Sequence, residues 1–461
     1  MAIVNQFVEL KEYVRLHPFD TATEEGRSKE RQRRALLTML ADLFSRACGF
    51  VVMILTLRIA LPYLGQERYG ILATIISFST ILMALDLGIG NALVGMVAKL
   101  AVGADEKLNR LINRALWVLT FVGMTIAALL LLASQFAPLG WAFKGAGPDS
   151  LTECRNTLAL FALLFGTSIP LGAMRNVYHG LQKGYVVHIV SAVATVISLG
   201  LLYLLTRFHA RMPAFLFVGY GMQVLSGGAL LLPFLFQGGI SAPRLEYFSG
   251  DETRELLKVG GLFLLLQVGV MAGWGADPLI LSSRIGPLAV VVFTLADKAS
   301  QLIAVPLYIL NKPLWATYAE ALARGDKSYI RNTLKRSLAV TAGIATSIAM
   351  VLYFGSQTIF RFLSKNVVEV PRGFLAIFLL WTIIRALGDC LAMYLNGVHV
   401  LRPQVILVML FIVVSIPAKI IFAGTSSLTG FIAASIISYL FASIIPAFTF
   451  FRREMFSSFR S

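Results

Sequence analysis

Long apolar runs, joined by short polar segments, extend along almost the whole chain. A helix needs roughly 20 predominantly apolar residues to cross the hydrocarbon core of a bilayer. On that scale the pattern predicts twelve spanning helices, at residues 36–62, 69–97, 112–135, 157–174, 186–206, 213–237, 257–283, 287–311, 337–360, 373–395, 403–423 and 427–450. The expected fold is therefore an all-α polytopic membrane protein with 12 transmembrane helices.

The twelve runs fall into two groups of six, which we expect to form two six-helix lobes. The groups start alike, because Tyr63-Leu-Gly65 precedes the second run and Ser283-Arg-Ile-Gly286 precedes the eighth. Transporters built from parallel repeats of this kind place the substrate path between their halves. The predicted divisions are an N-terminal tail at 1–35, an N-lobe at 36–237, an inter-lobe loop at 238–256, a C-lobe at 257–450 and a C-terminal tail at 451–461.

Composition supports a membrane protein. Of the 461 residues, 57% are hydrophobic and 14% are charged. Soluble domains are about 45–50% apolar and about 25% charged. A soluble multidomain enzyme is therefore excluded.

The charge of the chain indicates how it lies in the membrane. It carries 40 Lys and Arg against 24 Asp and Glu, a net charge of +16. Counted over the predicted loops, 26 basic residues lie on the side of the two termini and 9 on the other side. Because cytoplasmic loops are enriched in Lys and Arg, both termini are expected in the cytoplasm. The basic segment Arg27–Arg34 is expected to meet anionic headgroups, and no aromatic-basic module suggests nucleic acid as a partner.

Ten ionisable side chains fall within the predicted spans. Each costs at least about 2.5–3.5 kcal/mol in hydrocarbon, so such groups normally face a partner or a polar cavity. The basic ones are Arg46, Arg58, Lys298, Arg385 and Lys419, and the acidic ones are Asp42, Asp86, Asp277, Asp297 and Asp389. Seven of the ten lie in spans one, two, seven and eight, which are therefore expected to line a polar cavity.

Spacing suggests several ion pairs among these residues. Arg46 and Asp86 lie at similar depths and could pair, although Asp42, four residues before Arg46, competes for the same guanidinium. Arg385 and Asp389 have the same four-residue spacing and could neutralise each other. Lys419 lies near a span end, where its long stem is expected to extend to the interface.

The basic residues suggest an anionic substrate, because an arginine fork matches phosphate oxygens. The predicted substrate-binding residues, for a pyrophosphate or anionic glycan, are Arg46, Arg58, Lys298 and Arg385. The predicted sites for a coupling H⁺ or Na⁺, or for counter-charges, are Asp86, Asp277, Asp297 and Asp389. Neither the 3 cysteines nor the 5 histidines have metal-ligand spacing, and no catalytic motif is visible, so no metal, no cofactor and no enzymatic activity are expected.

Several segments carry a family resemblance. They are 61–72 (LPYLGQERYGIL), 85–93 (LDLGIGNAL), 178–184 (YHGLQKG), 276–281 (ADPLIL) and 318–326 (YAEALARGD). In this order they resemble Wzx-type polysaccharide flippases of the multidrug/oligosaccharidyl-lipid/polysaccharide exporter superfamily, and the resemblance covers essentially the whole chain.

The resemblance implies a multi-pass protein of the bacterial inner membrane that flips an undecaprenyl-pyrophosphate-linked oligosaccharide, such as an O-antigen or exopolysaccharide repeat unit. It implies alternating access of two six-helix lobes, with ion-coupled antiport favoured. The lipid-linked oligosaccharide and membrane lipids are the implied partners, and a polysaccharide polymerase and a chain-length regulator are compatible with it.

Other functions stay open at this stage. A drug/cation antiporter of the same superfamily is expected to have an acidic, aromatic cavity, and a lipid-linked peptidoglycan precursor flippase would differ mainly in its cargo. A membrane glycan ligase or polymerase is disfavoured, because the longest predicted outer loop, at 135–156, is too short for an extracytoplasmic catalytic domain.

Overall fold

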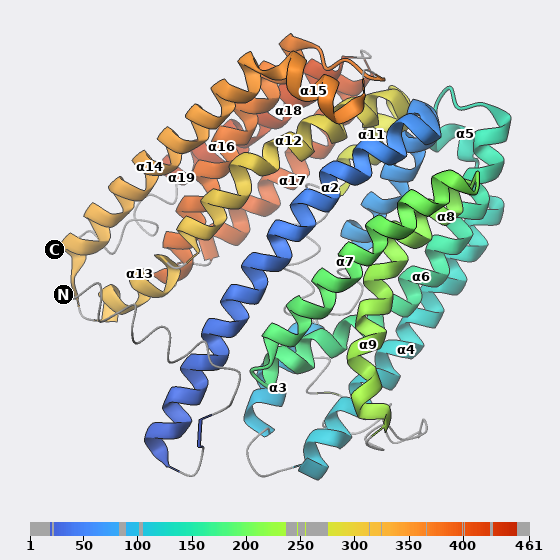
Figure 1. The fold of residues 1–461 in the computed structure, drawn as a ribbon. Helices are drawn as coiled ribbons and strands as arrows, with labels where there is room; N and C mark the ends of the chain where they lie inside the picture. The colour runs from blue at the N-terminus through green and yellow to red at the C-terminus, as the bar shows by residue number, and fades with distance from the viewer. Residues whose placement is uncertain are drawn as a thin grey trace. The chain divides into compact units, whose positions relative to one another are not determined.

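Helices form all the regular structure in the part of the chain that the structure, a computed structural model, describes (Figure 1). The described residues are 19–20, 23–82, 89–100, 105–236, 247, 254, 275–312, 314–323, 325–365, 367–398, 400, 402–424 and 427–449. Within them the all-helical prediction is confirmed.

Ten helical stretches of the described residues are long and apolar enough to cross a membrane. They are Arg33–Ser79, Glu106–Phe136, Pro148–Gly180, Gly184–Arg207, Met212–Phe236, Pro287–Asn311, Lys327–Phe354, Arg372–Gly397, Arg402–Ala423 and Leu428–Thr449. Each overlaps a predicted run, and Arg33–Ser79 overlaps two. The run at 257–283 falls mostly outside the described residues, so the count of twelve stays a prediction.

The chain divides into two compact units. Unit 1 comprises Met1–Ala60, Leu82–Ala137 and Thr152–Gln267, and unit 2 comprises Leu61–Ile81, Pro138–Leu151 and Val268–Ser461. The first helix, α2 (Glu24–Leu82), contributes to both, because it bends at Gly65.

Unit 1 packs around aromatic and aliphatic side chains. Its further helices are α3 (Ile89–Leu100), α4 (Asp105–Phe136), most of α6 (Pro148–Gly180), α7 (Gly184–Arg207), α8 (Met212–Leu216), the π-helical segment Phe217–Gly221 and α9 (Met222–Phe236). The Phe161 ring lies 5.7 Å from Phe165 and 5.6 Å from Tyr220, joining α6 to the π-helical segment. Large side chains such as Phe121 and Met124 are exposed on α4, as expected where a helix faces lipid.

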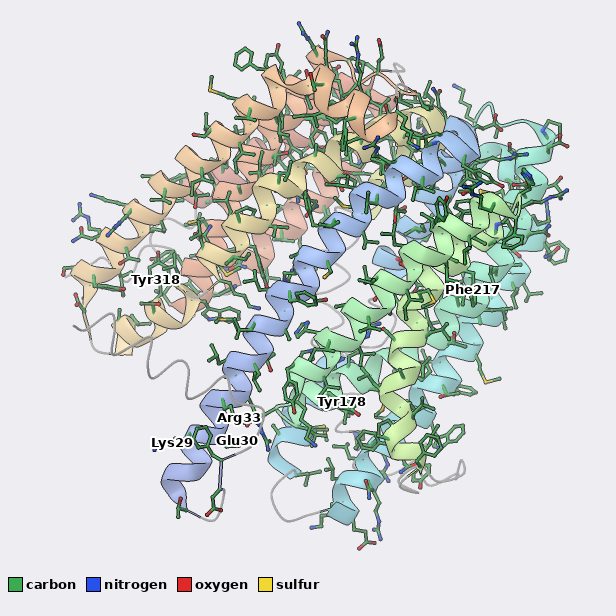
Figure 2. The ribbon with its side chains drawn as sticks, viewed as in Figure 1. Lys29, Glu30, Arg33, Tyr178, Phe217 and Tyr318 are labelled. Atoms are coloured by element: carbon green, nitrogen blue, oxygen red, sulfur yellow. The ribbon has the colours of Figure 1, made fainter. Side chains whose placement is uncertain are left out.

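Unit 2 contains the helices α5 (Leu139–Ala142), α11 (Asp277–Arg284), α12 (Pro287–Asn311), α13 (Leu314–Ala323), α14 (Lys327–Phe354), α15 (Ser356–Ser364), α16 (Arg372–Gly397), α17 (Arg402–Ala423), α18 (Leu428–Tyr439), the π-helical segment Leu440–Ile444 and α19 (Ile445–Thr449). Tyr318 on α13 is fully buried, and its ring meets that of Tyr394 on α16 edge to face at 5.5 Å (Figure 2). Short α13 is thereby anchored to the long helices of unit 2.

Helix starts in unit 2 follow local sequence signals. Pro287 opens α12 in the first turn, where its missing N–H costs no hydrogen bond. The Asp326 carboxylate caps α14 by accepting from the Tyr329 N–H at 2.9 Å, and this bond, with one from Ser328, holds the pKa of Asp326 below its ordinary value. The ninth predicted run, 337–360, begins ten residues after the start of α14. The prediction missed the first turns of the helix because they are polar and precede the apolar stretch.

One carboxylate organises the basic segment at the start of α2. Glu30 accepts hydrogen bonds from Arg33 Nε at 2.7 Å, from Arg34 Nε at 2.8 Å and from the Phe19 N–H at 3.0 Å (Figure 2). These bonds, led by that from Arg33, lower the pKa of Glu30 to about 2. Two arginines of the segment predicted to meet headgroups are thus bound by a protein carboxylate.

Among the described residues, the unit boundaries differ from the predicted lobes at two short segments. Residues 61–81 and 138–151, which the sequence prediction gave to the N-lobe, belong to unit 2. The cause is contact within unit 2, where the Gly147 N–H donates to Glu67 Oε1 at 2.8 Å and the Lys144 N–H donates to the Ser282 carbonyl at 3.3 Å.

The two glycine turns identified in the sequence share a backbone conformation. Gly65 has φ 79° and ψ 169°, and Gly286 has φ 127° and ψ 171°. Essentially only glycine adopts this region. Close packing adds a second glycine requirement, because a Cβ on Gly70 would lie 2.3 Å from the Pro287 carbonyl oxygen. The two turns therefore share one glycine-dependent backbone conformation.

Replacing Gly65 tests the turn. We expect Gly65→Ala to destabilise the protein by about 1–3 kcal/mol, because alanine is strained at this φ and ψ. No neighbouring atom lies within 4 Å of the added Cβ, so the effect is that of the backbone alone. The measurement is the thermal unfolding midpoint of the full chain in detergent.

Gly49→Ala is the matched control. Gly49 lies in the same helix with a helical φ and no atom within 4 Å of an added Cβ, so alanine should be neutral or stabilising by up to about 1 kcal/mol. Equal unfolding midpoints for the two variants would contradict a glycine-dependent turn.

Candidate functional site

A buried ion pair joins two helices of unit 2. Lys419 Nζ on α17 lies 2.6 Å from Asp277 Oδ1 on α11, and the two side chains are 1% and 9% exposed. The Lys419 ammonium also lies 5.7 Å from the centre of the Phe431 ring. The expectation that Lys419 extends to the membrane interface is therefore wrong, because a carboxylate 142 residues away in sequence holds it inside unit 2.

More charges surround this pair. Arg385 on α16 and Asp297 on α12 lie close enough to act on the Asp277 carboxylate through space. Four helices of unit 2, α11, α12, α16 and α17, thus bring together ionisable residues that the sequence separates by up to 142 positions.

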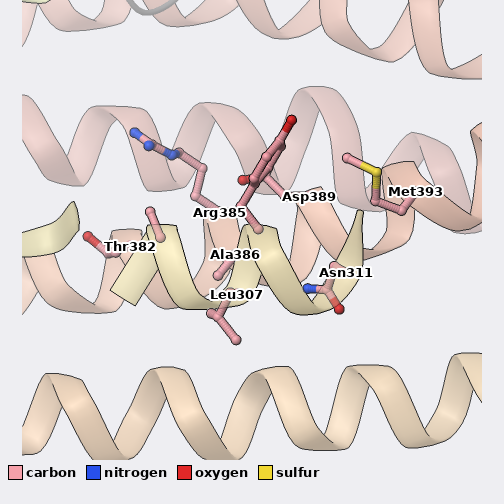
Figure 3. Close-up of a pocket in the computed structure, with 9 residues that line it drawn as sticks. Leu307, Asn311, Thr382, Arg385, Ala386, Asp389 and Met393 are labelled. Atoms are coloured by element: carbon pink, nitrogen blue, oxygen red, sulfur yellow. The ribbon is translucent and has the colours of Figure 1, made fainter. Parts of the chain in front are cut away.

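Arg385 and Asp389 do not neutralise each other as the sequence spacing suggested. Neither side chain has an ion-pair partner within 4 Å among the described residues, although the Arg385 charge does act on Asp389. Figure 3 shows the Arg385 guanidinium extended toward the Thr382 end of α16, away from Asp389. Both charges are therefore available to something other than each other.

A cavity of about 280 Å³ lies between α12 and α16 (Figure 3). Its lining residues are Ala304, Leu307, Tyr308 and Asn311 from α12 and Thr382, Arg385, Ala386, Asp389 and Met393 from α16. A hydrogen bond holds the Asn311 side chain in place, because its Nδ2 donates to Thr341 Oγ1 on α14 at 3.1 Å. The cavity thus combines an apolar wall with a few polar groups, the usual composition of a small-molecule site.

The two remaining charges of unit 2 that the sequence predicted for the site are Asp297 and Lys298, adjacent on α12. Both side chains are half-buried, and neither has an ion-pair partner within 4 Å in the described part of the chain. They are not among the lining residues of the cavity. Within hydrocarbon such charges need a polar surrounding.

Unit 1 holds the other described site residues, both on α2. Arg46 Nε donates to Asp42 Oδ1 at 2.9 Å, which confirms the local pair, and His188 Nδ1 on α7 lies 3.5 Å from the same oxygen. Arg58 is half-buried on the same helix. Asp86, the other predicted partner of Arg46, lies outside the described residues.

Arg175 is a half-buried arginine that directly follows the predicted run at 157–174. Helix α6 continues to Gly180, so Arg175 lies within the helical bundle of unit 1. One terminal nitrogen donates to Ser226 Oγ at 2.9 Å and to the Gln223 carbonyl, while its buried Nε has no hydrogen-bond partner among the described residues. The predicted run at 157–174 ends directly before Arg175, and α6 continues past both to Gly180. The position of Arg175 immediately after an apolar run was the one sequence feature that could have placed it in the helix.

The arrangement offers polar groups that can bind a ligand. Among the described residues, no group of three or more His, Cys, Asp and Glu could hold a metal ion. The site offers guanidinium and ammonium donors and separate carboxylate acceptors within spanning helices. Such groups can hold an anionic, hydroxyl-rich headgroup or a small cation.

Comparison with known proteins gives consistent matches. Residues 32–312 match the family described as "Polysaccharide biosynthesis protein", and residues 271–421 match the family "MatE". A "Putative O-antigen export protein" of Yersinia pseudotuberculosis is 22% identical over 411 residues, covering 86% of this chain and 91% of that protein.

Solved structures match in fold. A multidrug resistance MATE family transporter of the MOP superfamily, in an inward-facing conformation, has a TM-score of 0.68 at 14% identity, over 90% of this chain and 98% of that chain. The lipid II flippase MurJ, in an inward closed conformation, has a TM-score of 0.68 at 14% identity, over 92% of this chain and 90% of that chain.

A double-mutant cycle tests the Asp277–Lys419 pair. Removing one partner leaves a buried charge alone, so Asp277→Asn and Lys419→Met should each lower the free energy of unfolding by about 3–5 kcal/mol. The double variant should lose clearly less than the sum of the two losses. Denaturant titration of the full chain in mixed micelles measures all three.

The exposed pair Glu106–Arg110 on α4 is the control, and its coupling energy should stay below about 0.5 kcal/mol. Additive losses for Asp277→Asn and Lys419→Met would contradict a buried ion pair.

Proposed function

Because this chain belongs to the polysaccharide biosynthesis protein family and has the fold of the multidrug/oligosaccharidyl-lipid/polysaccharide exporter superfamily, we propose that it flips a lipid-linked oligosaccharide across the bacterial inner membrane. The family match, the similarity to an O-antigen export protein and the ten spanning helices among the described residues support a multi-pass membrane transporter. The cargo we propose is an undecaprenyl-pyrophosphate-linked oligosaccharide of the O-antigen or exopolysaccharide type, which the similarity to an O-antigen export protein supports.

The observation that carries this proposal is the placement of Arg385. Its guanidinium lies in a spanning helix, lines a cavity and has no carboxylate within ion-pair distance among the described residues. An uncompensated charge in the membrane costs at least about 2.5–3.5 kcal/mol, so it is retained where it binds something. A pyrophosphate offers oxygens that match the two-pronged fork of arginine.

Other basic residues are further candidates for contact with the anionic head group. Lys298 on α12 supplies a second cation in unit 2, and Arg46 and Arg58 supply two on α2. Arg46 would exchange its bond to Asp42 for substrate oxygens, which requires the Asp42 carboxylate to find another donor, such as His188 at 3.5 Å. The head group moves past these charges while its lipid tail stays in the bilayer.

Energy coupling is assigned to the carboxylates. Asp277 is bound to Lys419 and acts as a counter-charge, whereas Asp297 has no such partner among the described residues and is the site we assign to a coupling H⁺ or Na⁺. Asp86 keeps its predicted role on the sequence argument alone. The two six-helix lobes alternate access, with both termini in the cytoplasm as the 26 to 9 distribution of basic residues favours.

A second candidate is a drug/cation antiporter, which the match of residues 271–421 to the family "MatE" favours. The cavity argues against it, because a cationic drug meets Arg385 as well as Asp389 there. A peptidoglycan-precursor flippase is the third candidate, since the lipid II flippase MurJ has the same fold. A transport assay with each cargo separates the three.

Replacing Arg385 tests the anion site. We expect Arg385→Ala to slow flipping of a labelled undecaprenyl-pyrophosphate glycan at least about tenfold, because hydrogen bonds to charged groups contribute about 1.5–3 kcal/mol. Arg385→Lys should restore only part of the rate, since the fork is lost. Transport is measured in proteoliposomes with a membrane-impermeant glycosidase, which removes the label only from glycans that have reached the outer leaflet.

Arg361→Ala is the matched control, because Arg361 is an exposed arginine of unit 2 on α15, away from the cavity. A normal flipping rate for Arg385→Ala would refute the anion site. If the protein flips only lipid II, or exports only a cationic drug, the proposed cargo is wrong and the corresponding alternative function takes its place.

Asp297→Asn tests the coupling site. We expect this neutral variant to flip cargo at a rate that no longer responds to an imposed H⁺ or Na⁺ gradient, because asparagine cannot bind and release the ion. The rate is measured with and without each gradient in the same vesicles. Asp149→Asn, in the first turn of α6, is the control, and a gradient response retained by Asp297→Asn would leave Asp297 without a coupling role.

A further inference from the structure

The proposed function assigns no role to Asp389. It lines the cavity from α16, one helical turn beyond Arg385, and has no ion-pair or hydrogen-bond partner among the described residues. A carboxyl group without a partner offers oxygen atoms that accept hydrogen bonds, so we look for a ligand that brings donors. Hydroxyl groups and ammonium groups are the two candidates.

The charge of the cavity decides between these candidates. Arg385 lines the same cavity, so a cationic ligand beside Asp389 would also meet the positive guanidinium of Arg385. A net cation therefore gains little there. A ligand that is anionic at one end and rich in neutral hydroxyl groups at the other matches both residues.

The spacing along α16 fits such a ligand. Arg385 and Asp389 are four residues apart, which separates their backbones by about 6 Å along the helix axis, and the Arg385 guanidinium extends away from Asp389 (Figure 3). In a glycosyl diphosphate the phosphate groups and the far hydroxyl groups of the sugar ring are separated by at least a comparable length. With the phosphate at Arg385, the attached sugar ring lies beside Asp389.

The remaining lining residues suit a sugar ring. Asn311 Nδ2 gives one hydrogen to Thr341 and keeps a second one for a ligand oxygen. Leu307, Ala386 and Met393 provide an apolar wall for the C–H face of the ring (Figure 3). The volume of about 280 Å³ is just below the roughly 300–1,000 Å³ of drug-sized sites, which leaves room for one ring and not for an oligosaccharide.

We propose that the cavity between α12 and α16 is a sugar subsite, which binds the lipid-proximal sugar of the glycosyl-diphosphate cargo through Asp389 and Asn311. This inference rests on the proposed function and deepens it, because it places recognition of the first sugar at named residues. Asp389 accepts from ring hydroxyl groups, Asn311 donates to a ring or hydroxyl oxygen, and sugars further along the chain lie outside the subsite.

The test compares two lipids on the full chain in nanodiscs. One is a polyprenyl diphosphate bearing a single hexose, and the other is the same polyprenyl diphosphate without sugar. The unmodified protein should bind the hexose lipid at least about tenfold more tightly, since a hydrogen bond to a charged group is worth about that factor or more. We call this ratio the sugar advantage.

Variants then separate the subsite from the phosphate contact. Asp389→Asn should reduce the sugar advantage to below about threefold, because it removes the acceptor that the sugar hydroxyl groups use. It should not weaken binding of the sugar-free lipid, because the Arg385 guanidinium remains in the cavity. Met393→Trp should have the same effect by filling the cavity, which keeps the test valid if Asp389→Asn unfolds. Arg385→Ala should weaken binding of both lipids and keep the sugar advantage.

Glu369→Gln is the control for removal of a carboxylate, because Glu369 is exposed on unit 2 away from the cavity. A sugar advantage that survives both Asp389→Asn and Met393→Trp overturns the subsite. Equal affinity of the unmodified protein for the two lipids also overturns the subsite but leaves the flippase proposal standing. Failure to bind either lipid overturns both.

Discussion

The cost of placing charge in hydrocarbon governs this structure. An ionisable side chain within a spanning helix needs either an opposite charge or a polar cavity, and unit 2 contains both arrangements. Asp277 and Lys419 neutralise each other at 2.6 Å inside the helix packing. Arg385 and Asp389, one turn apart on the neighbouring α16, instead line a cavity and have no ion-pair partner among the described residues.

This difference separates a structural ion pair from the proposed binding site. A buried ion pair ties α11 to α17 and leaves neither charge available for a ligand. The charges along α12 and α16 keep their hydrogen-bonding capacity, and the helices that carry them are positioned by apolar contacts such as that of Phe293 with Phe378, whose rings lie 5.6 Å apart. A transporter needs both, because a headgroup can only exchange with groups that the protein has not already satisfied.

Hydrophobic patterning predicted most of the helices, but it predicted few of the contacts between charged side chains. Run length alone located the spanning helices, and the glycine turns at Gly65 and Gly286 were visible as short polar breaks. The Asp42–Arg46 contact followed from helical spacing, since both residues lie on one helix. Lys419 was misjudged because its partner lies 142 residues away, and proximity to a helix end says nothing about which neighbour a tertiary fold supplies. Arg175 lies outside the predicted run at 157–174 for a related reason. Helix α6 continues to Gly180, past the end of its apolar stretch, and hydrophobicity alone does not show this.

The central claim is that residue 389 of α16 faces a polar cavity that binds cargo. The most direct measurement is the reaction of Asp389→Cys with a charged, membrane-impermeant thiol reagent, in a chain whose native Cys48, Cys154 and Cys390 are replaced by alanine. The account predicts rapid labelling that hexose-bearing polyprenyl diphosphate slows. Val413→Cys is the control, because Val413 on α17 is 70% exposed and is expected to face lipid, so it should stay unlabelled in the bilayer. Labelling at position 389 that is as slow as at position 413, or that cargo leaves unchanged, would contradict it.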